Sequence, residues 1–357
     1  MTAVVTTRRA VLGAAAAVPL VRATRAHPVP RWEPSRPVNL LVGFSPGGGT
    51  DAISRLLQPS LQADLGQSVT VTNIISRLFQ PSPQASFGQP VTAGNRPGAS
   101  DTVAALAGTR APPDGHTLFM TTVSASAVVP PHMDPPPFDI YKDQTAIVLA
   151  AAVPLVVVVP ASSPARDLRG LVEMARANPG GLSYSSPGVA SQQHLVAELL
   201  AERAGMRMTH VPFDGTGQVV DELLAGRTDL TIATLPTCLP HIREGRVRAL
   251  ATTMPRRVEW LPGVPTVAEQ RFPGFEAAGF DASVWYMLMG PAGLPAEVME
   301  RFAASVTRAL GDPALHSRIR DMGFIPGGGT SADAAALLRR DAERYAALIR
   351  NADIRMA

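Results

Sequence analysis

Short apolar runs rich in β-branched residues alternate with helical patterns along most of this chain. Glycine or Asn-Pro follows several of the helical patterns, as is typical of helix ends. Strands that alternate with helices favour an α/β fold with largely parallel sheets. The expected strands are 38–42, 69–71, 117–122, 153–159, 182–185, 230–233, 247–252 and 282–288, and the expected helices start near 52 and cover 168–177, 192–204, 219–225, 296–310 and 333–351.

A tandem duplication interrupts this alternation. Residues 53–74 and 75–96 align at an offset of 22 and match at 14 of 22 positions. Two copies are too few for a solenoid. In the second copy Pro83 is added to Pro81, and this closely spaced pair disfavours a helix interior. We interpret the segment as a duplicated helix–strand unit or a surface excursion, without a function of its own.

The first 26 residues have the pattern of an export signal. Arg8 and Arg9 precede an apolar stretch at 10–21 that is too short to span a bilayer, and residues 23–26 form a small-residue cleavage region. The arginine pair resembles a twin-arginine signal, with an ordinary secretory signal as the alternative. We therefore expect residues 1–26 to be removed and the mature protein to be periplasmic.

Charge and cysteine content exclude several classes of function. The net charge is +3, but four arginines and no acidic residue lie in the first 26 residues, so the remainder carries −1. A near-neutral body does not favour nucleic acid as a partner. Cys238 is the only cysteine and cannot form an internal disulfide, so we expect a buried apolar side chain. The seven histidines are scattered, and we expect neither a metal nor a cofactor.

A glycine-rich turn at 43–51 joins the first expected strand to the first expected helix. Bare N–H groups and the positive end of the helix dipole make such a turn a candidate anion site. The turn ends in Thr50-Asp51, where a nucleotide-binding P-loop has Lys-Ser or Lys-Thr, and it has no dinucleotide fingerprint. A weakly charged carboxylate therefore suits it better than a triphosphate. Asp51 lies in the first helical turn, where capping alone could explain it.

A second junction of this kind lies at 185–191. Ser191 is a good N-cap for the helix expected at 192–204. His194 lies in the first turn of that helix, where it either faces a ligand or serves as a structural histidine. Two such junctions would bind one anion from both sides if they lie on facing domains.

Seven segments along most of the chain carry a shared set of motifs: 44–51, 95–99, 113–118, 186–195, 210–215, 261–266 and 272–276. Together they resemble the motifs of one family, the periplasmic solute-binding proteins of tripartite tricarboxylate transporters (Bug or TctC-like proteins). Members of that family have one helix–strand unit before the motif at 95–99, whereas this chain has two. Val189 and Ala190 stand in a loop that is richer in glycine in the family, which implies a tighter or more apolar pocket.

The resemblance implies a type II periplasmic binding protein, in which two α/β lobes are joined by two crossover strands with a ligand cleft between them. The first lobe would hold 36–152 and 284–357, and the second 153–283. The crossover strands would be 153–159 and 282–288. In this scheme Ser45, Gly47 and Gly48 face Val189, Ala190 and Ser191 across the ligand. The further candidate ligand residues are Asp51, Ser124, Ala125 and His194.

The implied function is capture of a small carboxylate for the membrane permease subunits of a tripartite transporter. We expect a monomer that catalyses nothing. One alternative is a ligand-sensing accessory protein for a signalling receptor, which would use the same fold. A remote alternative is an exported hydrolase with Ser191 or Ser45 as nucleophile. Residues 43–47 read Gly-Phe-Ser-Pro-Gly, but His194 lies too near Ser191 in the sequence for the usual triad layout.

Overall fold

The computed structural model describes residues 32–43, 49–74, 100–213, 216–277 and 280–351. The strands are β1 (Val38–Val42), β2 (Val69–Asn73), β3 (Thr117–Thr122), β4 (Gln144–Pro160), β5 (Leu182–Ser186), β6 (Met208–Pro212), β7 (Leu230–Thr234), β8 (Val247–Thr252), β9 (Ser283–Pro291) and β10 (Ile325–Gly328). The helices are α1 (Gly49–Leu65), α2 (Ser100–Thr109), α3 (Leu168–Ala177), α4 (Gln192–Ala204), α5 (Thr216–Leu224), α6 (Leu235–Arg243), α7 (Ala296–Leu310), α8 (Pro313–Asp321) and α9 (Ser331–Asn351). Shorter turns are η2 (Ser124–Val128), η3 (Pro130–His132) and η4 (Val267–Glu269).

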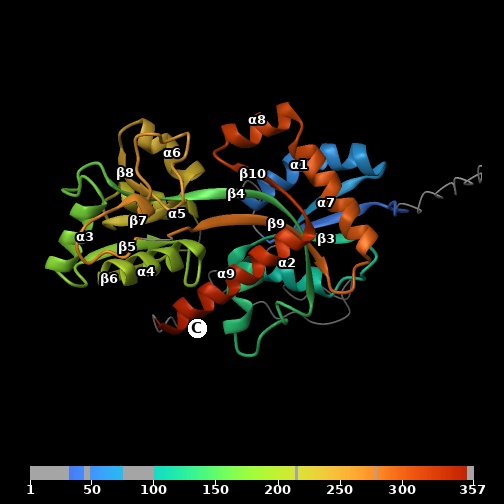
Figure 1. Ribbon diagram of the computed structural model, residues 1–357, viewed down its shortest axis with the longest axis horizontal. Helices are drawn as coiled ribbons and strands as arrows, with labels where there is room; N and C mark the ends of the chain where they lie inside the picture. Colours follow the sequence, from blue (N-terminus) through green and yellow to red (C-terminus); the bar gives the residue numbers. More distant parts are fainter. Residues whose placement is uncertain (1–31, 44–48, 75–99, 214–215, 278–279, 352–357) are drawn as a thin grey trace, which may run out of the picture. The chain divides into compact units, whose positions relative to one another are not determined.

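Two strands, β4 and β9, connect two groups of strands (Figure 1). We call β1, β2, β3 and β10 with their helices the first lobe, and β5 to β8 with theirs the second lobe. β9 pairs with β3 on one side and with β4 on the other. β4 runs for 17 residues and pairs with β9 and β10 in its first part and with β7 and β8 in its last part. Each lobe therefore builds its sheet on the same long strand.

The parallel pairing predicted from the sequence holds only within each lobe. β1 lies parallel between β2 and β3, and β5 lies parallel between β6 and β7. The prediction is wrong for β4, β8 and β9, which pair antiparallel with other strands. Strand β10, which was not predicted, also pairs antiparallel with β4. A parallel pair needs a crossover connection that returns the chain to the same end of the sheet. β4 and β9 carry the chain between lobes in opposite directions, so they pair antiparallel.

The centre of β4 is buried on both faces. Residues 155–159 are all fully buried. Leu155, Val157 and Val159 pack into one large apolar cluster, and Val156 and Val158 pack into a smaller cluster that contains Cys238. A strand covered on both faces has no polar face, which explains the uninterrupted β-branched sequence. The expectation for Cys238 is confirmed, since the thiol is buried and burial raises its pKa to about 12.

The first copy of the duplication forms α1 and β2. Its apolar side chains Ile53, Leu57, Leu61 and Leu65 are buried at helical spacing against the large cluster. The amide of Gln58 donates to the carbonyl of Val69 at 2.6 Å, which fixes the helix against the start of β2. The second copy, residues 75–96, lies outside the described residues.

A buried ion-pair network ties α1 to α7. The guanidinium of Arg301 is almost fully buried and lies 2.5 Å from the Oδ2 atom of Asp64 on α1. Ser305 donates its hydroxyl to the same oxygen at 2.5 Å, and Arg308 pairs with the other oxygen of Asp64. Glu33 forms a second pair with Arg301 at 3.1 Å. A buried arginine of this kind depends on its carboxylate, because an uncompensated buried charge is strongly destabilising.

The two copies should not be interchangeable in this position. Deletion of 75–96 leaves Leu61 and Asp64 in place. In the shortened chain Asn73 lies as many residues before Ser100 as Asn95 does in the full chain. Deletion of 53–74 places Pro83 and Ser86 at the Leu61 and Asp64 positions. We expect the first deletion to keep the free energy of unfolding near that of the full chain. The second should lose about 3 kcal/mol or more, measured by urea unfolding.

A matched control restores the two residues. Pro83→Leu with Ser86→Asp in the chain that lacks 53–74 should recover most of the lost stability. Equal stability of the two deletion variants would contradict this account of why the first copy occupies α1.

Candidate functional site

The start of α1 is held against the crossover strand β9. Ser45, Gly47 and Gly48 lie outside the described residues, and α1 begins at Gly49. A Cβ atom on Gly49 would lie 2.2 Å from the hydroxyl oxygen of Tyr286, so only glycine allows this approach of helix and strand. The hydroxyl oxygen of Thr50, the next residue, is buried without a hydrogen-bond partner among the described residues. No local sequence pattern indicated Tyr286, because its contact with Gly49 joins segments far apart in the chain.

Asp51 is part of a polar network on the first turn of α1. Its side chain is almost fully buried, and its Oδ1 atom accepts from Arg55 at 2.8 Å and from the amide of Asn73 at 2.9 Å. Arg55 also donates to the side-chain oxygen of Asn73 at 2.9 Å. The network joins α1 to the end of β2, and Arg55 compensates the negative charge. Asp51 therefore fixes the helix start and does not oppose a nearby anion with an uncompensated charge.

Ser124 and Ala125 open a π-helical turn, η2, directly after β3. Ala125 is buried and Ser124 is half-buried. The hydroxyl of Ser126 donates to that of Thr121 at 2.9 Å, which fixes the turn to its strand. Single π-helical turns are rare overall, but those that occur are often found at functional sites. Thr122, the last residue of β3, is paired in register with Tyr286, so this turn adjoins the same part of β9 as the start of α1.

The loop between β5 and α4 has a fixed backbone. Ser191 is the N-cap of α4, as predicted, and its hydroxyl oxygen accepts from the N–H of His194 at 3.3 Å. Its own N–H donates to the carbonyl of Gly188 at 3.2 Å. Ala190 adopts a left-handed backbone with φ of 60°, which is unfavourable for a residue with a Cβ atom. Ala190 was expected to face the ligand, but its N–H donates to Nδ1 of His194 at 3.0 Å.

Three aromatic rings stack behind this loop. The rings of His194 and His210 lie 3.9 Å apart and are nearly parallel, and Tyr184 follows His210 at 4.9 Å. Nε2 of His210 lies 2.6 Å from the hydroxyl oxygen of Ser186, at the end of β5. Tyr184 donates its hydroxyl to Glu198 on α4. The stack therefore joins β5, β6 and α4 under the loop.

Both histidines of the stack are neutral. Burial and the neighbouring His210 lower the pKa of His194 to about 3, and burial lowers the pKa of His210 to about 4. A neutral His194 is also required by its hydrogen bond, because Nδ1 can accept only when it carries no proton. His194 is thus a buried acceptor for the loop and supplies no positive charge to a ligand.

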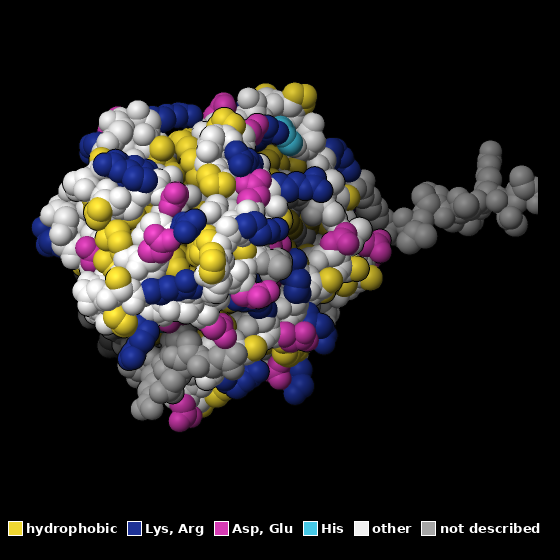
Figure 2. Space-filling model, turned by 60° about the vertical axis from the view of Figure 1, so that its left-hand side comes forward, with side chains coloured by type: hydrophobic (Ala, Val, Ile, Leu, Met, Phe, Trp, Pro, Cys, Tyr) yellow, Lys and Arg dark blue, Asp and Glu magenta, His cyan; other side chains and the backbone are white. Residues whose placement is uncertain are grey.

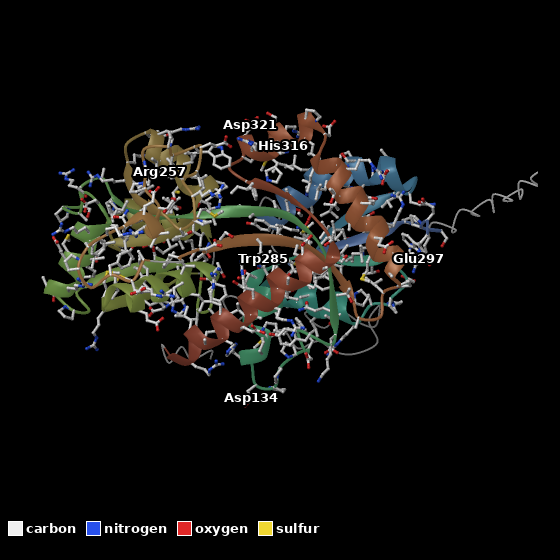
Figure 3. The ribbon with its side chains drawn as sticks, in the orientation of Figure 1. Asp134, Arg257, Trp285, Glu297, His316 and Asp321 are labelled. Atoms are coloured by element: carbon white, nitrogen blue, oxygen red, sulfur yellow. The ribbon has the colours of Figure 1, made fainter. Side chains whose placement is uncertain are left out.

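The start of α4 is also attached to β9. The side-chain amide of Gln192, the first residue of α4, donates to the carbonyl of Ser283 at 3.4 Å and to the hydroxyl of Tyr345 on α9. Trp285, labelled in Figure 3, donates from its ring nitrogen to Asp341 on α9 at 2.9 Å. β9 therefore contacts the start of α4 at Ser283 and the start of α1 at Tyr286, three residues further along.

Other kinds of site find no support in the part of the chain that the structure describes. No group of three or more His, Cys, Asp or Glu side chains is placed to hold a metal. No helix among these residues is long and apolar enough to cross a membrane. On the face shown in Figure 2, basic and acidic side chains are interspersed.

The neutral histidine pair predicts an acid-dependent loss of stability. In the unfolded chain both imidazoles become protonated near pH 6.5. In the folded chain His210 stays neutral down to about pH 4 and His194 down to about pH 3. The contribution of the two neutral imidazoles to the free energy of unfolding is complete above pH 6.5 and is lost as the pH falls below that value. Each histidine should add about 1.4 kcal/mol per pH unit to the slope of unfolding free energy between pH 5 and 6. Urea unfolding across this range measures the slope.

His210→Gln serves as the control, because it removes one of the two titrating groups. The slope of this variant should fall by about half of the contribution of the pair. An unchanged slope would show that His210 is protonated in the folded protein.

Comparison with curated proteins finds relatives over nearly the whole chain. A "UPF0065 protein in tcbD-tcbE intergenic region" of Pseudomonas sp. (strain P51) is 35% identical over 344 residues, which cover 96% of this chain and 94% of that protein. Protein BugT of Bordetella pertussis is 30% identical over 318 residues, 89% of each chain.

Solved structures show the same fold. Rhodopseudomonas palustris Rpa4515 with adipate is 28% identical with a TM-score of 0.74, and it covers 90% of this chain and 99% of its own. MatC (Rpa3494) of the same organism, with bound malate, is 25% identical with a TM-score of 0.71 and covers 88% and 99%. The fold is thus that of the periplasmic binding proteins of the TctC/Bug type, as the resemblance implied.

The model of the family described as "TctC: Tripartite tricarboxylate transporter family receptor" matches residues 75–354. The match begins at the second copy of the duplication. Members of this family are binding proteins and not enzymes. The chain belongs to the TctC family of tripartite tricarboxylate transporter receptors, also known as Bug proteins.

Proposed function

We propose that this protein captures a small carboxylate outside the cytoplasm and presents it to the membrane permease subunits of a tripartite tricarboxylate-type transporter. The observation that supports this most is the position of two helix starts on one strand. α1 approaches β9 at Tyr286, and α4 approaches it at Ser283. The positive ends of both helix dipoles are thereby directed to neighbouring points, which favours a bound anion.

The charges around the two helix starts favour a carboxylate over a phosphate. Asp51 is compensated by Arg55, and His194 and His210 are neutral. The N–H groups of Gln192 and Gln193 lie in the first turn of α4, where no carbonyl of the same helix can accept them. Donors of this kind suit a singly charged carboxylate group, with water bridging the remaining contacts.

The proposed ligand residues follow from the same scheme. Ser45, Gly47 and Gly48 would contact the ligand from the first lobe, and Val189 and Ser191 from the second, with Ser124 and Ala125 beside them. Ala190 and His194 would act through the backbone of the loop, and Asp51 through the first turn of α1. The first lobe would comprise 36–152 and 284–357, and the second 153–283. Rpa4515 and MatC were solved with adipate and malate, which are small dicarboxylates.

The mature chain would act in the periplasm as a monomer, after removal of residues 1–26 by export. Closure of the two lobes around the ligand would mark the loaded state for the permease.

Small carboxylates should raise the melting temperature of the mature protein. A ligand present at 100 times its dissociation constant stabilises a folded protein by about 2.7 kcal/mol. We expect a thermal-shift screen to give a clear shift with at least one mono-, di- or tricarboxylate and none with neutral sugars of similar size. Shifts with sugars or neutral amides alone would overturn the proposal.

A pair of variants isolates one backbone donor of α4. Gln192→Ala and Gln192→Pro both remove the side chain, but only proline also removes the N–H. Proline is compatible with the first helical position, and Ser191 before it is already extended, with φ of −62° and ψ of 154°. We expect the proline variant to bind its carboxylate about tenfold more weakly than the alanine variant, by calorimetry. Equal affinities would exclude this N–H as a ligand donor.

A further inference from the structure

The peptide between Val189 and Ala190 is oriented by His194. The Ala190 N–H points to Nδ1 of His194 at 3.0 Å, and both residues are buried. In a planar trans peptide the N–H and the preceding C=O point in opposite directions. The carbonyl of Val189 therefore points away from His194 and from the ring stack behind it, and Val189 itself is half-exposed.

This carbonyl has no donor among the residues that the structure describes. No N–H or hydroxyl of the described residues donates to Val189 O, and the described turn bonds of the loop end on Gly188 O and Ser191 O. A second acceptor is close in the chain, since the side-chain oxygen of Gln192 is buried with no described partner. The Val189 carbonyl and the side-chain oxygen of Gln192 are thus acceptors close in the chain to the N–H donors at the start of α4, and a plain carboxylate can satisfy only the donors.

We propose that His194 fixes the Val189 carbonyl toward the ligand, so that the site selects carboxylates that also carry a hydroxyl or ammonium group. The inference rests on the proposed function and specifies its ligand class. His194 is a positioning residue in this scheme, and the group that meets the ligand is the carbonyl of Val189. The left-handed backbone of Ala190 is unfavourable for alanine, so the orientation depends on the hydrogen bond to His194.

Three matched ligand pairs test the selection. Each pair has one chain length and differs in the donor group: succinate with malate, glutarate with 2-hydroxyglutarate, and adipate with 2-aminoadipate. Calorimetry on the mature protein should show at least about tenfold tighter binding of the substituted member in the pair whose length fits, because the plain member leaves the carbonyl unpaired.

Two variants test the part played by His194. His194→Phe keeps a ring in the stack but removes the acceptor, so the peptide can rotate and present its N–H. His194→Asn loses the ring but keeps a side-chain oxygen that can accept from Ala190. We expect the affinity ratio within the fitting pair to fall to about threefold or less in the Phe variant and to persist in the Asn variant. Because both affinities are measured on the same variant, a loss of stability alone does not change this ratio.

The outcomes separate this inference from the proposed function. Binding of no member of any pair, together with no response to other carboxylates, would overturn the proposed function and this inference with it. Binding of plain and substituted members with equal affinity by the wild-type protein would overturn the inference and leave carboxylate binding intact. A ratio that persists in His194→Phe would show that selection does not depend on the acceptor of His194.

Discussion

The packing of two helix starts against β9 is the constraint on which the site depends. Gly49 approaches the hydroxyl of Tyr286 too closely for any side chain, and Gln192 donates to the carbonyl of Ser283 on the same strand. β9 is itself paired with β3 and β4, so it is held by both neighbours. Both helix starts are therefore positioned by contacts with one strand, and not only by the loops that lead into the helices.

Neutralisation is the second feature of this site. The charged and titratable groups near the helix starts are either compensated, as Asp51 is by Arg55, or kept uncharged by burial, as His194 and His210 are. What remains for a ligand are backbone dipoles and hydroxyl groups. Such groups recognise position and direction more than total charge, because each N–H and each C=O has a fixed orientation. The orientation of a single peptide can then decide which functional groups a ligand must carry.

The duplication shows that two similar segments can differ in how well their side chains pack and pair in one structural position. Both copies carry the glutamines and the arginine of the helix, but only the first has Leu61 at a buried position and Asp64 opposite Arg301. The family match begins at the second copy, whereas α1 and β2 are formed by the first. The family model thus aligns from the second copy, whereas the first copy supplies the partner of the buried arginine.

Local patterns in the sequence determined most individual elements. The strands at 38–42, 117–122 and 247–252 and the helices at 168–177, 192–204 and 296–310 have the predicted bounds, because their apolar periodicity and their caps are local signals. Helix α6 was missed, since its two prolines argue against a helix. Helix α8 was missed although Asp312 before Pro313 is a readable start signal.

The tertiary structure decided the rest. The antiparallel pairing of β4 and β9, the contact of Gly49 with Tyr286 and the bond from Ala190 to His194 all depend on packing. The first two join segments distant in the chain, and the third depends on a buried ring stack that His210 completes from another strand. The sequence by itself therefore determined the family, the helices and strands of the two lobes, and the two loops that belong to the candidate site. Only the fold decided which N–H groups those loops leave open, because backbone orientation is fixed by partners that no local pattern specifies.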